Sequence, residues 1–269
     1  TLQYAQKEAS RYGYHIHYAL KANANPALLK EISRHGMGAD CVSGGEIERA
    51  LQNGFSPEKI VYAGVGKSDA EIRTGLKNNI YAFNAESIAE LEVLNELAGK
   101  EGKKARVALR INPDVDARTH HYITTGLEEN KFGIGMQQME QAIDRVQALD
   151  MLDLSGLHFH IGSQITDMSV YQGLCLRINE IQEKLIRRHI LVDHINVGGG
   201  LGVHYDAPDK LPVPDFASFF RIFHEHLHLQ PGQSLHFEPG RALVAQSGTL
   251  IARVLYIKSG LNKAFAILD

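Results

Sequence analysis

Two residues near opposite ends of this sequence could together perform carbonyl chemistry. Lys21 directly follows the apolar run 15–20, and Glu238 directly follows the apolar run 235–237. The amine of a lysine can form a Schiff base with an aldehyde, and a carboxylate can hold the protonated nitrogen of a pyridine ring. These two groups are what a pyridoxal phosphate site needs from its protein. They can serve one site only if the fold brings them to the same place.

Eight short apolar runs, separated by amphipathic segments, are the elements that must position these residues. The runs begin near Ile16, Ala39, Ile60, Tyr81, Val107, Gly156, Ile195 and Leu235. Runs that are apolar on both faces are typical of parallel strands covered by helices. Strand–helix alternation repeated eight times favours a (β/α)8 TIM barrel over an open doubly wound sheet. We therefore expect an α/β protein in which residues 1–243 form a pyridoxal phosphate-binding barrel.

The residues after the predicted barrel follow a different pattern. Residues 249–257 and 264–268 have the composition of strands, with no helix between them. We expect residues 244–269 to begin a C-terminal β domain whose remainder is absent. The sequence lacks an initiator Met, opens inside a predicted helix and stops inside a predicted strand, so we expect an incomplete chain.

The composition and net charge disfavour nucleic acids and membranes as partners. The chain has 269 residues, of which 44% are hydrophobic and 22% charged, and its net charge is −3. This balance is typical of a globular protein and offers no basic surface to attract nucleic acid or anionic lipid. No apolar run approaches the roughly 20 residues that a membrane-spanning helix requires. Cys41 and Cys175 are the only cysteines, which predicts free thiols and a reducing cytoplasm.

The polar residues that follow the predicted strands should meet at one mouth of the barrel, because TIM-barrel active sites lie at the carboxyl ends of the strands. These residues are Lys21, Asp40, Ser43, Glu46, Arg110, Asn112, His160, Ser163, Gly198, Gly199, Gly200, Glu238, Pro239, Gly240 and Arg241. Barrels often bind phosphate between the loops after strands seven and eight. We therefore expect the backbone at Gly200 and Gly240, with the hydroxyl of Ser163, to hold a phosphate.

Each of these residues also has a structural interpretation. The triple glycine could serve only to form a tight turn, and Lys21 could form a structural ion pair. His160 could lie flat against a cofactor ring or be a hydrogen-bonded core histidine, and His158 fits a structural role better. Glu238 would decide the type of chemistry. A carboxylate keeps a pyridine nitrogen protonated, and the protonated ring is a strong electron sink suited to decarboxylation.

Three further strings resemble known motifs without completing them. Residues 224–228 match the zinc pattern H-E-x-x-H, but no third ligand is apparent, and we expect no metal site. Residues 64–68 resemble half of a phosphate loop, but Val61 stands where that motif needs glycine. Residues 198–202 follow a strand, but Val203 leaves the dinucleotide fingerprint incomplete. Cys41 lies in an apolar strand and fits a buried, inert thiol.

Ordered blocks along nearly the whole chain resemble the diaminopimelate decarboxylase family, within the alanine racemase-like fold class of pyridoxal phosphate enzymes. The block around Lys21 is Tyr-Ala-Leu-Lys-Ala-Asn at 18–23. The other blocks are 38–46, Arg110–Pro113 with Thr119-His120, Thr125-Gly126 and 130–133, then 156–164, 198–202 and 238–241.

The resemblance implies roles for these residues. Lys21, His160 and Glu238 would be catalytic: Lys21 would bond the cofactor, His160 would stack on its ring, and Glu238 would bind its nitrogen. Arg241 would also bind the distal carboxylate of the substrate, as a guanidinium can through two parallel hydrogen bonds. The implied cofactor-binding set is Lys21, Asp40, Arg110, His160, Ser163, Gly199, Gly200, Glu238, Pro239, Gly240 and Arg241. The family's second domain adds a cysteine–glutamate pair across a homodimer interface and a tyrosine, none of which lies in this chain.

The leading hypothesis is therefore decarboxylation of meso-2,6-diaminopimelate to L-lysine, a step of lysine biosynthesis, by an enzyme of which this chain is an incomplete part. His120 and Lys131 favour that substrate. One alternative is a related decarboxylase of another basic amino acid or of a carboxylated polyamine. A second is a non-catalytic pyridoxal phosphate-binding barrel, although such carriers are usually single barrels and the strands after Arg241 disfavour this interpretation.

Overall fold

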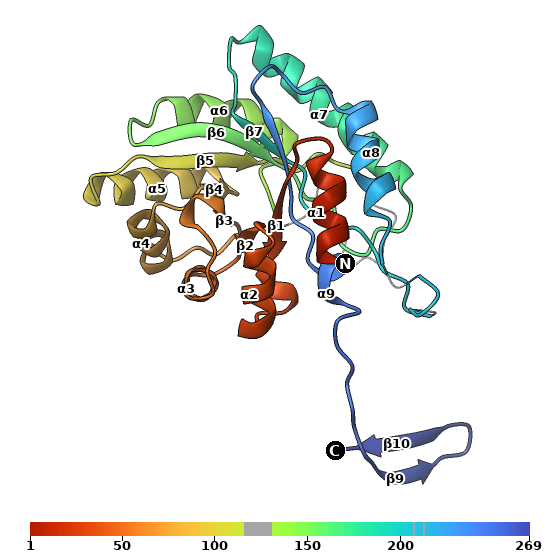
Figure 1. Ribbon diagram of the computed structural model, residues 1–269. Helices are drawn as coiled ribbons and strands as arrows, with labels where there is room; N and C mark the ends of the chain where they lie inside the picture. The colour runs from red at the N-terminus through yellow and green to blue at the C-terminus, as the bar shows by residue number, and fades with distance from the viewer. Residues whose placement is uncertain (116–130, 207, 212) are drawn as a thin grey trace.

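The computed structural model describes residues 1–115, 131–206, 208–211 and 213–269. Its parallel strands form a closed barrel in the order of the sequence, as Figure 1 shows. The strands are β1 His15–Ala19, β2 Gly38–Cys41, β3 Ile60–Tyr62, β4 Ala82–Ala85, β5 Ala105–Arg110, β6 Leu152–His158, β7 His194–Asn196 and β8 Ser234–Phe237. Each of the eight predicted strands is found within a few residues of its expected start. The predicted (β/α)8 TIM barrel is thus confirmed.

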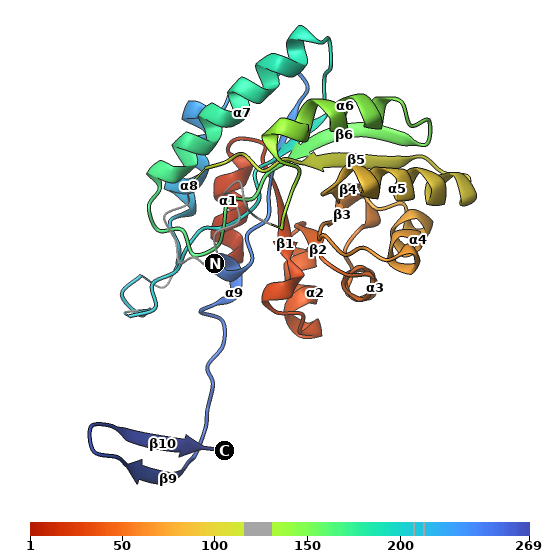
Figure 2. The same ribbon diagram turned by 180° about the vertical axis from the view of Figure 1, so that it is seen from behind.

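Helices cover the outside of the barrel in both views of the molecule (Figures 1 and 2). They are α1 Leu2–Ser10, α2 Pro26–Arg34, α3 Gly44–Gln52, α4 Asp69–Asn78, α5 Ile88–Lys100, α6 Met139–Gln147, α7 Ser169–Arg187, α8 Phe216–His226 and α9 Arg241–Val244, with 3-10 turns η1 Leu20–Ala22, η2 Pro57–Lys59 and η3 Met136–Gln138. Short polar side chains begin several of them. The side chains of Asn25, Ser43 and Ser87 accept hydrogen bonds from backbone N–H groups in the first turns of α2, α3 and α5.

The pairing of the first and last strands closes the barrel and sets the distance between the two ends of the sequence. β1 pairs in parallel with β8, with His15 opposite His236 and Ile16 opposite Phe237. β1 also pairs with β2, with Ala19 opposite Asp40. Because the strands are parallel, the residues that follow β1, β2 and β8 emerge at the same mouth of the barrel.

Aromatic packing anchors β8 against its covering helix. The ring of Phe237 on β8 meets Phe219, Phe220 and Phe223 of α8 edge-on, with centroid separations of 5.4, 4.9 and 5.0 Å. Edge-on contacts of this kind contribute about 0.5–1.5 kcal/mol each beyond the burial of the rings. This cluster fixes the residue that directly precedes Glu238.

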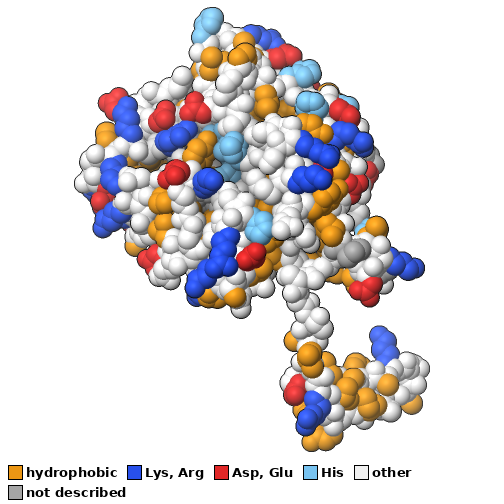
Figure 3. Space-filling model, viewed as in Figure 1, with side chains coloured by type: hydrophobic (Ala, Val, Ile, Leu, Met, Phe, Trp, Pro, Cys, Tyr) orange, Lys and Arg blue, Asp and Glu red, His pale blue; other side chains and the backbone are white. Residues whose placement is uncertain are grey.

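The segment after the barrel ends in a two-stranded antiparallel hairpin, β9 Val254–Ser259 and β10 Ala264–Leu268. Figure 1 shows this hairpin extending away from the barrel. Its side chains are exposed, and Figure 3 shows many hydrophobic ones on its surface. The predicted first strand starts too early, since residues 249–253 lie outside any strand. No helix in the described part of the chain has the length and apolarity needed to cross a membrane.

Candidate active site

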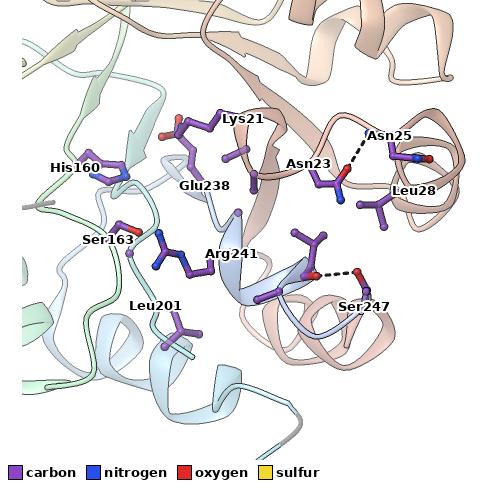
Figure 4. Close-up of a pocket in the computed structure, with 17 residues that line it drawn as sticks. Lys21, Asn23, Asn25, Leu28, His160, Ser163, Leu201, Glu238, Arg241 and Ser247 are labelled. Atoms are coloured by element: carbon purple, nitrogen blue, oxygen red, sulfur yellow. Dashed lines mark hydrogen bonds between the residues drawn. The ribbon is translucent and has the colours of Figure 1, made fainter. Parts of the chain in front are cut away.

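A cavity of about 870 Å³ opens at the mouth where the barrel strands end (Figure 4). Several of the predicted site residues line it: Lys21, His160, Ser163, Gly200, Glu238, Gly240 and Arg241. The remaining lining residues are Ala19, Ala22, Asn23, Asn25, Leu28, Leu201, Val244, Ala245, Ser247 and Gly248. The structure thus brings together the lysine from the first strand and the carboxylate from the last.

Lys21 belongs to η1, the single turn that follows β1, and its amine is paired with a buried carboxylate. Its Nζ lies 2.8 Å from Oδ2 of Asp40, whose side chain is only 1% exposed, whereas the Lys21 side chain is 49% exposed. Desolvation lowers the pKa of Lys21, but attraction to Asp40 outweighs it and raises this pKa overall. The ion pair with Asp40 therefore favours the protonated amine, although desolvation alone would favour its deprotonation.

Glu238 follows β8 and is almost completely buried beside the cavity. Its Oε1 accepts hydrogen bonds from Nδ2 of Asn196 at 2.7 Å and from Nδ2 of Asn84 at 3.3 Å. Its Oε2 lies 2.9 Å from Nε2 of His158. Desolvation alone would raise the pKa of Glu238, but the charge and hydrogen bond of His158 and the charge of Lys21 lower it overall. The geometry therefore favours an ionised carboxylate.

His160 lies between apolar residues after β6 and lines the same cavity. Desolvation, together with the positive charges of Arg110 and Lys21, lowers the pKa of His160 to about 3. The imidazole is therefore neutral near pH 7. A neutral, flat ring on a cavity wall is suited to stacking on an aromatic ligand.

The glycines after β7 and β8 bring backbone close to the cavity. Gly200 has a φ of +98°, and a Cβ there would lie 2.8 Å from the carbonyl oxygen of Gly162. A Cβ on Gly240 would lie 3.1 Å from the Cβ atoms of Ala19 and Ala22. A side chain at either position would thus crowd the wall of the cavity. Gly200 needs glycine for its backbone conformation as well as for space.

Arg241 begins α9 and lies on the cavity wall opposite the strand ends that carry Lys21 (Figure 4). Its Nη1 donates a hydrogen bond to the hydroxyl of Tyr205, and the guanidinium lies 5.8 Å from the centre of the tyrosine ring. Tyr205 was missed from the sequence because nothing marks it within its loop. Arg241 has guanidinium donors beyond the one used by Tyr205, so it can bind a carboxylate.

Four residues of the implied cofactor-binding set lie outside the lining of the cavity, namely Asp40, Arg110, Gly199 and Pro239, and so do Ser43, Glu46, Asn112 and Gly198, which were expected at the same mouth. Asp40 instead binds Lys21. Arg110 forms a buried ion pair with Glu86 at 2.8 Å and is not among the residues that line the cavity. Gly199 packs directly against the backbone of Glu238, since a Cβ on Gly199 would lie 2.3 Å from the backbone oxygen of Glu238. The backbone oxygen of Pro239 accepts a hydrogen bond from Ala19.

Besides Tyr205, the structure adds Asn84, Asn196 and Glu86, which the sequence did not single out. It also gives His158 a partner. Asn84 on β4 and Asn196 on β7 bind Glu238, and their only sequence signal is a polar residue within an apolar strand. His158, expected to be structural, contacts Glu238 directly. Glu86, which follows β4, binds Arg110 and accepts hydrogen bonds from two backbone N–H groups. Pairings across the barrel interior cannot be read from spacing along the chain.

The structure places residues of two of the motif-like strings, 64–68 and 224–228, in arrangements that do not match those motifs. Lys67, in the string that resembles a phosphate loop, is buried in an ion pair with Glu90 at 2.6 Å. Helix α8 ends at His226, so His228 of the H-E-x-x-H string does not continue that helix. Thr119-His120, Thr125-Gly126 and Asn130 lie outside the described residues.

Comparisons with known proteins agree with this geometry. Residues 2–245 match the family model of the pyridoxal-dependent decarboxylases, pyridoxal binding domain. The chain is 57% identical to a diaminopimelate decarboxylase of Bacteroides thetaiotaomicron, covering 100% of this chain and 70% of the relative. It is 42% identical to a diaminopimelate decarboxylase of Aquifex aeolicus, covering 94% of this chain and 60% of the relative. The crystal structure of diaminopimelate decarboxylase from Helicobacter pylori complexed with L-lysine superposes with a TM-score of 0.90 at 39% identity, covering 100% of this chain and 68% of that one.

Proposed function

This chain belongs to the family of pyridoxal-dependent decarboxylases, and we propose that the full-length protein decarboxylates meso-2,6-diaminopimelate to L-lysine with pyridoxal phosphate as cofactor. The proposal depends on one observation above all. The amine of Lys21 and the carboxylate of Glu238 line a single cavity, although 216 residues separate them in the sequence. The names of the relatives, and the lysine bound to one of them, support the choice of substrate and product.

The residues of the cavity fit pyridoxal phosphate both in their donors and in their shape. Lys21 would hold the cofactor covalently through Nζ, and Glu238 would accept a hydrogen bond from its ring nitrogen. The hydroxyl of Ser163 and the backbone at Gly200 and Gly240 would hold the phosphate. A Cβ at Gly200 would fill part of this cradle, which explains why a glycine suits that position.

The side chains of this chain would act around the reacting centre in distinct ways. When bound, the cofactor supplies an electron sink for the carbon that loses carbon dioxide. Glu238, held as a carboxylate, would keep the ring nitrogen protonated and so maintain that sink. Asp40 orients the amine of Lys21 through the 2.8 Å ion pair. The neutral ring of His160 would cover one face of the site and exclude water from it.

Arg241 would select the substrate by binding its distal carboxylate. Its guanidinium lines the cavity and is held from one side by the hydroxyl of Tyr205. Arginine binds carboxylates in a bidentate geometry that lysine cannot reproduce. A substrate with a second carboxylate is thus favoured over one that ends in an amine or a guanidinium alone. This feature distinguishes diaminopimelate from the basic amino acids and carboxylated polyamines that remain the alternative substrates.

Substitution of Lys21 tests the cofactor site directly. We expect Lys21→Ala in the full-length protein to abolish the visible absorbance of the added cofactor and its trapping by borohydride, because the reducible covalent bond cannot form. Lys184→Ala, which changes an exposed lysine of α7, should leave both unchanged. Trapping that persists in the Lys21→Ala protein would mean that another lysine holds the cofactor.

A substrate panel then tests the reaction. The full-length protein should release carbon dioxide from meso-diaminopimelate, and Arg241→Lys should lower kcat/KM for it by about 10- to 100-fold, the factor that one or two charge-assisted hydrogen bonds supply. Faster turnover of lysine, ornithine or arginine would instead favour the alternative decarboxylases. Cofactor binding without turnover of any of them would favour a non-catalytic carrier.

Further parts of the proposal concern the whole protein. We take residues 1–243 as the barrel and residues 244–269 as the start of a β domain, and the exposed apolar side chains of the β9–β10 hairpin support this division because such a surface needs a partner. We expect the full-length protein to form a homodimer in a reducing cytoplasm, and the free, buried thiols of Cys41 and Cys175 fit that compartment. Sedimentation of the full-length protein would test the dimer.

A further inference from the structure

The carboxylate of Glu238 is enclosed by side chains from three other strands of the barrel. Nδ2 of Asn84 on β4 and Nδ2 of Asn196 on β7 both donate to Oε1, at 3.3 and 2.7 Å. Nε2 of His158 on β6 lies 2.9 Å from Oε2. All four side chains are almost completely buried. His158, Asn84 and Asn196 do not line the cavity, so they can act on a bound ligand only through Glu238.

Asn84, Asn196 and His158 each place a side-chain nitrogen next to the carboxylate of Glu238. Oδ1 of Asn196 accepts a hydrogen bond from the backbone N–H of Gly198 at 2.9 Å, which directs its Nδ2 toward Glu238. Oδ1 of Asn84 and Nδ1 of His158 are buried without a hydrogen-bond partner among the described residues. A buried polar atom without a partner is costly, and the strong hydrogen bonds that an ionised acceptor makes offset that cost. The network is therefore built around a charged Glu238.

The hydrogen bonds that Glu238 accepts from the described residues leave one acceptor position of its carboxylate unused. A carboxylate has about four acceptor positions, two on each oxygen. Within the described part of the chain, Asn84 and Asn196 use both positions of Oε1, and His158 uses one of Oε2. Since Glu238 lines the cavity, the remaining position on Oε2 is available to a ligand.

We propose that His158 is a positioning residue of the reaction, which donates from Nε2 to Glu238 and thereby keeps the proton shared by Glu238 and the cofactor on the ring nitrogen. A hydrogen bond to a carboxylate makes it less basic, so the proton prefers the nitrogen over Oε2. Asn84 and Asn196 act in the same direction from Oε1. This inference rests on the proposed function, because it assumes that pyridoxal phosphate occupies the cavity.

Variants of the full-length protein test the donor role. His158→Phe keeps a planar ring and loses the donor, whereas His158→Gln keeps an N–H group of similar reach. We expect His158→Phe to weaken cofactor binding by about 10- to 100-fold, the contribution of a hydrogen bond to a charged group. The absorbance of the bound cofactor near neutral pH should shift toward the form with an unprotonated ring nitrogen. His158→Gln should recover most of both properties.

A buried histidine elsewhere in the barrel provides the matched control. His194 on β7 is fully buried and has no hydrogen bond to Glu238, so His194→Leu should leave the cofactor affinity and spectrum unchanged. If His158→Phe keeps the wild-type affinity and spectrum, or if His158→Gln is impaired as much as His158→Phe, the donor role is overturned. If the unaltered protein binds no cofactor at Lys21, as judged by borohydride trapping, the proposed function fails instead.

A measurement on the unaltered protein tests the inference even if the variants do not fold. Nitrogen-15 NMR shows which ring nitrogens of a histidine carry protons, and full-length protein without cofactor is sufficient. We expect Nε2 of His158 to carry a proton. A proton on Nδ1 with a bare Nε2 would show that Glu238 donates to His158, and would overturn the inference.

Discussion

A chain of histidines at the other mouth of the barrel predicts that acid destabilises this fold well above the pH at which carboxylates titrate. His17 on β1 and His236 on β8 are buried, with Nε2 of His17 lying 2.8 Å from Nδ1 of His236. Nδ1 of His17 lies 3.0 Å from the carbonyl oxygen of Lys59, which can only accept, so that nitrogen donates. Nε2 of His17 must then accept from His236. Neutral rings satisfy this chain. A second proton on His17, at Nε2, would face the N–H group of His236, whereas a second proton on His236, at its Nε2, would face the hydroxyl of Ser234 at 2.9 Å.

The pKa values of these buried imidazoles follow the same logic. Burial, with smaller contributions from neighbouring charges, lowers the pKa of His17 to about 4 and that of His194 to about 3, and it lowers the pKa of His236 as well. In the unfolded chain each imidazole returns to its ordinary pKa of about 6.5. Between about pH 6.5 and pH 4 the unfolded state therefore binds more protons than the folded state. The free energy of unfolding must fall as the pH falls through this window, and these residues add no pH dependence above it.

The expected magnitude is large compared with the stability of a typical domain. At about pH 5.5 each histidine that stays neutral in the fold costs about 1.4 kcal/mol, because its unfolded counterpart is about nine-tenths protonated. His17, His194 and His236 together then lower the free energy of unfolding by roughly 4 kcal/mol between about pH 7.5 and pH 5.5. Net stabilities of domains are only about 5–15 kcal/mol.

Urea unfolding followed by circular dichroism at several pH values measures this slope. His194→Leu removes one titrating ring that has no hydrogen-bond partner among the described residues, so it should reduce the slope by about one proton whatever it does to absolute stability. His228→Leu, at an exposed position, should leave the slope unchanged. A free energy of unfolding that is flat between about pH 7.5 and pH 5.5, or an equal slope in the His194→Leu protein, would refute the assignment of neutral buried rings.

Three further predictions concern the site and its support. Glu238→Gln should lower kcat by about 100-fold or more, because the amide cannot hold a protonated ring nitrogen by charge; steady-state kinetics would measure it, and wild-type kcat would contradict the role of Glu238. Gly200→Ala should weaken cofactor binding at least about tenfold, since its Cβ would lie 2.8 Å from the Gly162 oxygen, whereas Gly66→Ala meets nothing within 4 Å and should bind normally in the same titration. Glu86→Ala should destabilise the fold by about 3–5 kcal/mol, because it leaves the buried Arg110 unpaired. Glu92→Ala, which breaks an exposed pair with Arg145, should leave the unfolding midpoint nearly unchanged, and equal midpoints for the two variants would argue against a buried pair.

Much of the barrel could be predicted because its signals are local. The apolar runs indicated the number and order of the strands, and the cap of α3 is equally local, since the Ser43 side chain accepts a hydrogen bond from the backbone N–H of Glu46. The extent of β9 was overestimated because the mostly apolar segment 249–253 continues the strand pattern, whereas the pairing with β10 begins only at Val254. Strand propensity alone does not make a strand when no neighbour supplies hydrogen bonds.

Some residues of the site could likewise be predicted from local signals, whereas their partners could not. Lys21, His160, Ser163 and Glu238 were found because each follows a predicted strand, and barrel geometry gathers such residues. The prediction that Arg110 belongs to the cofactor-binding set stays a prediction, and the structure adds its pairing with Glu86, which the sequence did not indicate. A long side chain can reach several partners, and its choice depends on which opposite charge the packing leaves nearby.

The sequence by itself determined the order of the elements, the mouth at which chemistry is possible, and the two groups that could hold a pyridoxal cofactor. Only the tertiary structure decided the state of those groups. Asp40 raises the pKa of Lys21, against the effect of desolvation, and His158 keeps Glu238 charged. These effects act over about 3 Å, between the ends of β1 and β2 for Lys21 and between β6 and the residue after β8 for Glu238. Burial and partner charge set the protonation of a side chain, and both exist only once the barrel has closed.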